Sequence, residues 1–164
     1  MSSASMLPRV LAASSDINTG TDTTKVITSD TLAGSNLGAK SFCIVVKESD
    51  ANTAVADGKS AFVVPASMNG MNIVAATASV HTAGTTNTTD IQIRRRRVTT
   101  DVDVLSTKIT IDSTEQSSVT ADAPLVINTS NDDLATGDNI YVDVDAISTT
   151  PATGLSVTIT AQLP

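Results

Sequence analysis

Apolar and polar residues alternate in two segments near the end of the chain. In residues 155–163 every second residue is apolar, and the residues between them are Ser, Thr or Gln. Residues 140–145 alternate in the same way. Because successive side chains of a β-strand point to opposite faces, both segments predict strands with one buried and one solvated face. The side chains expected to be buried are Ile140, Val142, Val144, Leu155, Val157, Ile159, Ala161 and Leu163, whereas Tyr141, Asp143 and Asp145 are expected to face outward.

Two connections in the chain have the composition of hairpin loops. Residues 148–154 contain Pro151 and Gly154, and residues 81–89 contain Gly84 among several threonines. Such residues favour turns between antiparallel strands. We therefore expect residues 139–147 to pair with residues 155–163, and residues 71–80 to pair with residues 90–98.

Short β-branched runs recur from about residue 25 to the end of the chain. Clusters of Gly, Asn, Asp and Thr separate them, and no long stretch shows helical periodicity. This pattern predicts an all-β, two-sheet antiparallel sandwich of jelly-roll type with eight or nine strands, and an immunoglobulin-like sandwich is the second choice. The runs are 25–28, 41–47, 60–64, 71–80, 90–98, 104–111, 125–128, 139–147 and 155–163.

The segment before residue 25 has a different composition. It is rich in Ser, Thr, Asp and Asn, and its apolar island consists of Met6, Leu7, Val10 and Leu11. So small an apolar set does not stabilise a fold by itself. Residues 1–24 are therefore predicted to form an arm that docks on a partner, and residues 25–164 to form the β-sandwich body.

Composition and charge exclude several classes of partner. Aromatic residues make up 2% of the chain, so stacking platforms for bases or sugars are nearly absent. The formal net charge of −7 repels phosphate backbones, and we expect no nucleic-acid partner. No apolar run reaches the roughly 18 residues of a membrane helix, so we expect no membrane partner. The N-terminus has no basic region before a long apolar run, which predicts synthesis without a secretory signal peptide.

Residues that often carry chemistry are sparse. The single histidine, His81, lies beside a predicted turn, and no serine stands in a nucleophile motif. Residues 128–139 gather Asp and Asn, which favours either ordinary turns or a calcium loop, although the spacing matches no known loop motif. Cys43 lies in an apolar run and is expected to be buried. We expect no enzyme activity, no metal and no cofactor.

Four consecutive arginines, Arg94 to Arg97, form the most unusual motif. Alternation places Arg95 and Arg97 on the same face as Ile91 and Ile93, the expected core face. A buried arginine needs a charged partner. The alternatives are a solvated strand end, a bulge that re-aims the side chains, carboxylates of a neighbouring subunit, or nucleic acid. Asp101 and Asp103, close behind the run, are expected to be solvated or paired with these arginines.

Three stretches of the chain resemble a family of small phage and prophage virion proteins. They read FVVPASMNGMNIVAATASVHTAGTTNTTDIQIRR, DVLSTKITIDSTEQSS and VINTSNDDLATGDNIYVDVDAISTTPATGLSVTI, and together they cover about residues 60–160. The resemblance is to capsid decoration (cement) proteins and to fibre or tail-tip domains of jelly-roll type. The four arginines depart from the short Ile-Arg-Asn stretch usual in this family.

This resemblance implies a non-enzymatic structural protein that decorates and stabilises a phage capsid from the outside. Its expected partner is the major capsid protein or another virion protein, its expected oligomer is a homotrimer, and its expected location is the capsid exterior of a virion assembled in the host cytoplasm. The alternative is a receptor- or glycan-binding domain of a phage tail fibre, for which Tyr141 is a weak candidate contact. The candidate partner-binding residues are Met6, Leu7, Val10, Leu11, Arg94, Arg95, Arg96 and Arg97.

Overall fold

The computed structural model describes residues 10–20, 24–58 and 60–164. These divide into two compact units. One runs up to Ala39 and includes Gln162–Pro164, and the other spans Lys40–Ala161. The predicted boundary lay after residue 24, whereas the division in the structure follows Ala39 because residues 24–39 fold with the N-terminal segment.

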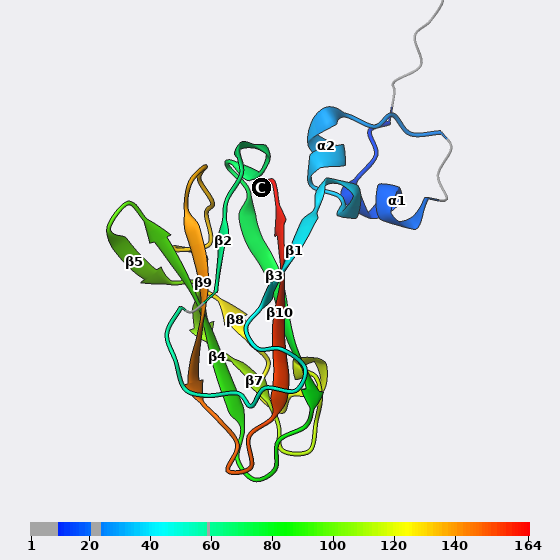
Figure 1. The fold of residues 1–164 in the computed structure, drawn as a ribbon. Coiled ribbons are helices and arrows are strands. Elements are labelled where there is room, and N and C mark those ends of the chain that lie inside the picture. Colours follow the sequence, from blue (N-terminus) through cyan, green and yellow to red (C-terminus); the bar gives the residue numbers. More distant parts are fainter. Residues whose placement is uncertain (1–9, 21–23, 59) are drawn as a thin grey trace, which may run out of the picture. The chain divides into compact units, whose positions relative to one another are not determined.

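The larger unit consists of antiparallel strands arranged as a sandwich, and the all-β prediction is confirmed (Figure 1). One sheet has the order β1-β10-β3, and the second has the order β2-β9-β4-β5 with β7 also pairing with β4. A small third sheet pairs β6 with β8. The strands are β1 (Lys40–Val45), β2 (Ala61–Val63), β3 (Asn72–Thr82), β4 (Thr89–Arg97), β5 (Thr100–Asp103), β6 (Leu105–Thr107), β7 (Ile109–Ile111), β8 (Val126–Ile127), β9 (Asn139–Ala146) and β10 (Thr153–Gln162).

The strand order is that of a jelly roll. The first and last strands, β1 and β10, are antiparallel neighbours, and β2 and β9 pair in the same way in the other sheet. Consecutive strands from β1 to β4 alternate between the two sheets. This is the arrangement expected when one long antiparallel pair wraps around a common core.

The two predicted hairpins are wrong. Strands β3 and β4 lie in different sheets, and so do β9 and β10. Both connections are arches between the sheets, and the arches pair with each other: the backbone N–H groups of Thr85 and Thr150 each donate to the other residue's carbonyl, at 3.1 and 3.2 Å. Alternation identifies the buried face of a strand but not its neighbour, so the loop composition was compatible with either connection.

The burial pattern of β9 and β10 agrees with the predicted alternation. Side chains of β10 from Leu155 to Ala161 alternate between full burial and contact with solvent, with Val157 at 0% exposure and Thr158 exposed. Three positions differ from the prediction. Leu163 lies beyond the end of β10 and is 39% exposed, Asp143 is buried, and Cys43 is exposed because its neighbours Phe42 and Ile44 point toward the core of the sandwich.

An aromatic pair joins the edges of the two sheets. Phe42 on β1 and Phe62 on β2 stack with ring centroids 3.9 Å apart, and both pack against the hydrophobic core. Because β1 and β2 are edge strands of opposite sheets, this contact closes one side of the sandwich. Apart from this pair, the core consists of aliphatic side chains, as the low aromatic content requires.

The smaller unit contains short helices that the periodicity did not predict. They are α1 (Ser14–Thr19), α2 (Ser29–Ala33) and the 3-10 turn η1 (Asn36–Gly38), and two further 3-10 turns in the larger unit are η2 (Ala66–Met68) and η3 (Ser118–Thr120). Residues 25–28, expected to be a strand, contribute only a single bridge between Val26 and Leu11. None of the helices in the described ranges has the length and apolar content that a membrane crossing requires.

Candidate functional site

Arg95 lies on the core face of β4, as the alternation predicted. Its side chain is 9% exposed, and Nη1 donates to the backbone carbonyl of Asp133 and, at 2.5 Å, to Oδ1 of the same residue. The carboxylate partner therefore comes from the segment between β8 and β9 of the same chain. This arrangement pairs the charge without moving Arg95 away from the core, while the buried Nε of Arg95 has no hydrogen-bond partner among the described residues.

Arg97 binds the same segment at two points. Its Nε and Nη2 donate to the two carboxylate oxygens of Asp138 at 2.9 and 2.7 Å, and Nη1 lies 2.9 Å from Oδ2 of Asp133. The Asp138 side chain is 2% exposed. Its Oδ2 also accepts the backbone N–H of Ala135, so one carboxylate ties β4 to the turn that begins β9.

The other two arginines lie on the opposite face of β4. Arg94 donates from Nε to Asp143 on β9 at 2.6 Å, and its Nη1 lies 3.2 Å from Asp101 on β5. Arg96 forms a bidentate pair with Asp101, at 2.7 Å for both bonds. Of the two alternatives predicted for Asp101, solvation or pairing with nearby arginines, the structure shows the pairing.

Tyr141 lies within this outer group of charges. The guanidinium carbons of Arg94 and Arg96 are 4.8 and 5.5 Å from its ring centroid, within the range of cation–π contacts. Asp143, two residues after Tyr141 on β9, is 5% exposed and bonded to Arg94. The aromatic ring of Tyr141 and the carboxylate of Asp143 are therefore already engaged by arginines.

The ion pairs shift the titration of the carboxylates. The hydrogen bond from Arg96 lowers the pKa of Asp101. Burial by itself would raise the pKa of Asp138, but hydrogen bonds from Arg97 and from the backbone of Ala135 outweigh it, and the pKa lies below its usual range. Asp132 behaves in the opposite way, because burial raises its pKa and the neighbouring charge of Asp133 adds to the effect.

The acidic segment 128–139, considered above as either ordinary turns or a calcium loop, supplies carboxylates to the arginine run. Two of its carboxylates, Asp133 and Asp138, bind arginines. In the part of the chain that the structure describes, no group of three or more His, Cys, Asp or Glu side chains is placed to hold a metal ion. The segment is a structural partner of the arginine run.

These contacts change the interpretation of the arginine run as a subunit contact. Each of the four arginines has a carboxylate partner within its own chain. Carboxylates of a neighbouring subunit are therefore not needed to balance these charges. The assignment of Arg94 to Arg97 as partner-binding residues stays a prediction, but the argument from unpaired charge no longer supports it.

The N-terminal unit presents large apolar side chains to solvent. Val10 and Leu11 from the predicted apolar island are 60% and 61% exposed, and the structure adds Ile27, Leu32 and Leu37, at 55%, 41% and 75%. Met6 and Leu7 lie outside the described residues. We call the five exposed residues the N-terminal apolar surface. Ile27, Leu32 and Leu37 were not predicted from the sequence, although isolated aliphatic residues in a polar segment could have indicated them.

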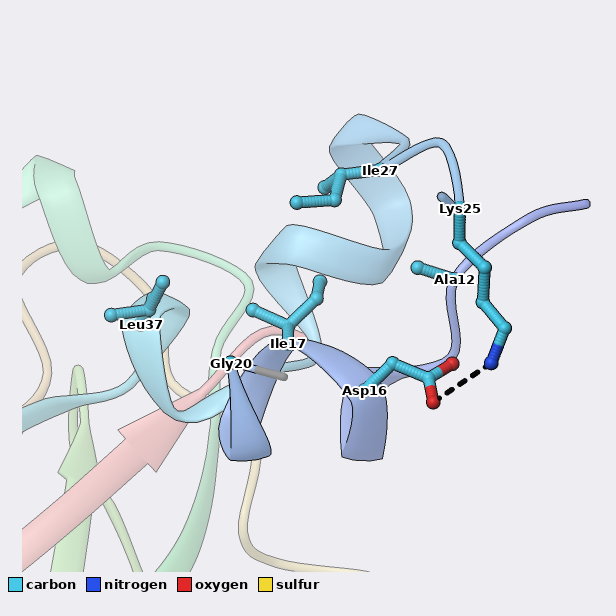
Figure 2. A pocket seen from close by; sticks show the side chains of 7 residues that line it. All are labelled: Ala12, Asp16, Ile17, Gly20, Lys25, Ile27 and Leu37. Carbon is cyan, nitrogen blue, oxygen red and sulfur yellow. Dashed lines mark ion pairs between the residues drawn. The ribbon is translucent and has the colours of Figure 1, made fainter. Parts of the chain in front are cut away.

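A hollow of about 290 Å³ opens on this unit (Figure 2). Ile17 on α1, Ile27 before α2 and Leu37 on η1 surround it, and Ala12 and Gly20 complete its apolar lining. At one side Lys25 Nζ lies 3.0 Å from Asp16 Oδ1. The hollow therefore combines an apolar floor with a charged margin, a composition suited to an aliphatic side chain of a protein partner.

Comparison of the chain with protein-family models, curated proteins and solved structures found no match. The resemblance to phage virion proteins therefore stays a prediction that rests on the three sequence stretches quoted above.

Proposed function

We propose that this protein is a non-enzymatic structural component of a virion that decorates and stabilises a phage capsid from the outside. The N-terminal apolar surface carries the proposal. Five large aliphatic side chains that are 41–75% exposed lie on a small unit beside a hollow with an apolar floor. Ile27 and Leu37 also line the hollow, and several exposed apolar groups on one small unit are typical of protein-binding sites.

Docking of this surface has a physical basis. Burial of an exposed aliphatic side chain contributes roughly 1.5–3 kcal/mol. A partner that covers these five side chains therefore gains a favourable contribution in proportion to the exposed area that it buries. A groove between neighbouring subunits of the major capsid protein offers an apolar contact of this kind. Met6 and Leu7, from the same apolar island, belong to the proposed contact.

The jelly-roll body suits a decoration protein that must stay rigid in solvent. The four ion-paired arginines fasten β4 to β5, to β9 and to the segment before β9. As part of the proposal, the protein is a homotrimer that assembles in the host cytoplasm and ends on the capsid exterior.

Copy number tests the proposal against its alternative, a receptor- or glycan-binding domain of a tail fibre. Quantitative mass spectrometry of purified particles of the encoding phage should find on the order of hundreds of copies, because a symmetric shell repeats each docking site many times. A few tens of copies or fewer would assign the protein to the tail. Absence of the protein from the particles would refute both assignments.

A further inference from the structure

The outer faces of the two sheets differ sharply in charge. On the β2-β9-β4-β5 side, the strands present Arg94, Arg96, Asp101 and Asp145. On the β1-β10-β3 side, the described strands contain one charged residue, Lys40, at the start of β1. In a chain with a net charge of −7, one broad sheet face is therefore almost free of charge.

Hydroxyl groups and small apolar side chains cover this uncharged face. Thr158 lies exposed on the central strand β10, and Ser41 and Thr160 bond to each other at 2.8 Å across β1 and β10. Ser79 and Ser156 form the equivalent pair, at 3.1 Å, across β3 and β10. The other outward side chains on the flanking strands are Cys43, Val45, Val74, Ala75, Thr77 and His81, all exposed. We call this set the hydroxyl face.

We propose that the hydroxyl face is the surface through which copies of this chain associate with one another. Two molecules that each carry −7 repel wherever charged surfaces meet, and this face allows approach without opposing like charges. A hydroxyl group is both a donor and an acceptor. Rows of Ser and Thr are therefore self-complementary, as an interface between identical patches requires. Such an interface joins two copies and is separate from the contacts within the proposed homotrimer.

The size of the face sets the strength of the contact. β10 has 10 residues, and three strands with about 3.3 Å per residue and about 4.8 Å between strands cover a plane on the order of 500 Å². This is less than the roughly 800 Å² per partner of a standard interface. Association is therefore weak, with a dissociation constant on the order of 10–1000 µM.

Salt distinguishes this contact from one made by ion pairs. Screening reduces the repulsion between acidic molecules, so higher ionic strength strengthens association through an uncharged face. A contact built on the arginine run and acidic groups of a second copy weakens under the same conditions. The inference does not depend on the capsid role, and purified protein is sufficient to test it.

Sedimentation equilibrium of the full chain over a concentration series, at low and at high salt, tests the inference. The unmodified chain should associate, and more strongly at high salt. Thr158→Glu should weaken association at least about tenfold, because it places like charges opposite each other at the centre of the face. Thr107→Glu, on the exposed side of β6, adds the same charge elsewhere and should leave association unchanged. Circular dichroism confirms that both variants are folded.

Three results would overturn the inference. The first is a monomer at all concentrations up to about 1 mM, the upper end of the dissociation constants given by the interface size. The second is association that weakens with salt or responds equally to the two variants. The third is unchanged sedimentation of Thr158→Glu together with altered hydrogen exchange in residues 10–39, which would mean that the chain's own N-terminal unit covers the face.

Discussion

Arg97 holds the carboxylate of Asp138 through two parallel hydrogen bonds of 2.9 and 2.7 Å. The arginine side chain is 40% exposed, whereas that of Asp138 is 2% exposed. The pair therefore connects the surface end of β4 to a buried point at the start of β9. Charge-assisted bidentate bonds of this kind are stronger than neutral hydrogen bonds.

Asp138→Asn should lower the free energy of unfolding by about 2 kcal/mol at neutral pH, because it removes a charge that two donor groups need. The folded pKa of Asp138 is depressed, so its contribution is fully present above the unfolded value of 3.8 and is lost as pH falls through the folded value. Urea unfolding at pH 7 and near pH 3 measures this difference.

Asp122→Asn, at an exposed position, is the control and should change stability by less than about 0.5 kcal/mol. Equal effects of the two variants would contradict a structural role for the Arg97 pair.

Asp132→Asn should change the free energy of unfolding in the opposite direction. Burial raises the pKa of Asp132, so its ionised form opposes folding at neutral pH. The variant should therefore be more stable than the unmodified chain at pH 7, by an amount on the order of 1 kcal/mol. This advantage should shrink as pH falls through the raised folded pKa, because the native carboxyl then takes up a proton. The same urea titrations measure it, and a variant less stable than the unmodified chain at pH 7 would show that the carboxylate makes a favourable contact.

Val157→Asp should destabilise the sandwich by several kcal/mol, about 3–5, because Val157 is fully buried between the sheets and no cation lies on its face of β10. Thr107→Asp introduces the same carboxylate at an exposed strand position and should cost less than about 0.5 kcal/mol. Thermal unfolding followed by circular dichroism separates the two. A Val157→Asp variant as stable as the control would place this side chain outside the core.

Val98→Asn should raise stability by roughly 0.5–1 kcal/mol. Val98 follows β4 in a two-residue turn with a φ of 57° and is 92% exposed, so a β-branched side chain adopts a left-handed conformation without any packing to offset the strain. Asparagine tolerates that conformation well. Val119→Asn, at a position that is 74% exposed on η3 and does not have a positive φ, should give no such gain. Differential scanning calorimetry would detect the shift, and equal changes at both sites would mean that the turn is not strained.

Much of the body could be predicted from the sequence because burial follows local alternation. Val142, Val144, Val157 and Ile159 are buried where the pattern of period two places them. The neighbour of each strand could not be predicted from the sequence, since strand pairing depends on contacts between residues that are distant in the chain. The loops at 81–89 and 148–154 therefore suggested hairpins, whereas the chain crosses there between the sheets.

The carboxylate partners of the arginines could not be predicted from the sequence for the same reason. The sequence indicated that Arg95 points to the core and needs a counter-charge, and it singled out the acidic segment 128–139 for a different reason. Their meeting depends on the pairing of β4 with β9, which brings residues about forty positions apart into contact. The N-terminal helices were missed for a local reason, because Ser, Thr and Asp have weak helix propensity. Thr28 at the N-cap of α2 and Gly20 after α1 are capping signals that favoured helices.

The proposed decoration role depends most on the N-terminal apolar surface, and co-sedimentation with undecorated phage capsids tests it most directly. The double variant Val10→Asp and Leu11→Asp charges this surface at two side chains that are 60% and 61% exposed, so the fold should survive while attachment fails. Val119→Asp, at an exposed position on the jelly-roll body, serves as the control. We expect the unmodified chain and the control to sediment with the shells and the double variant to stay in the supernatant. Equal binding by all three would contradict attachment through the N-terminal unit.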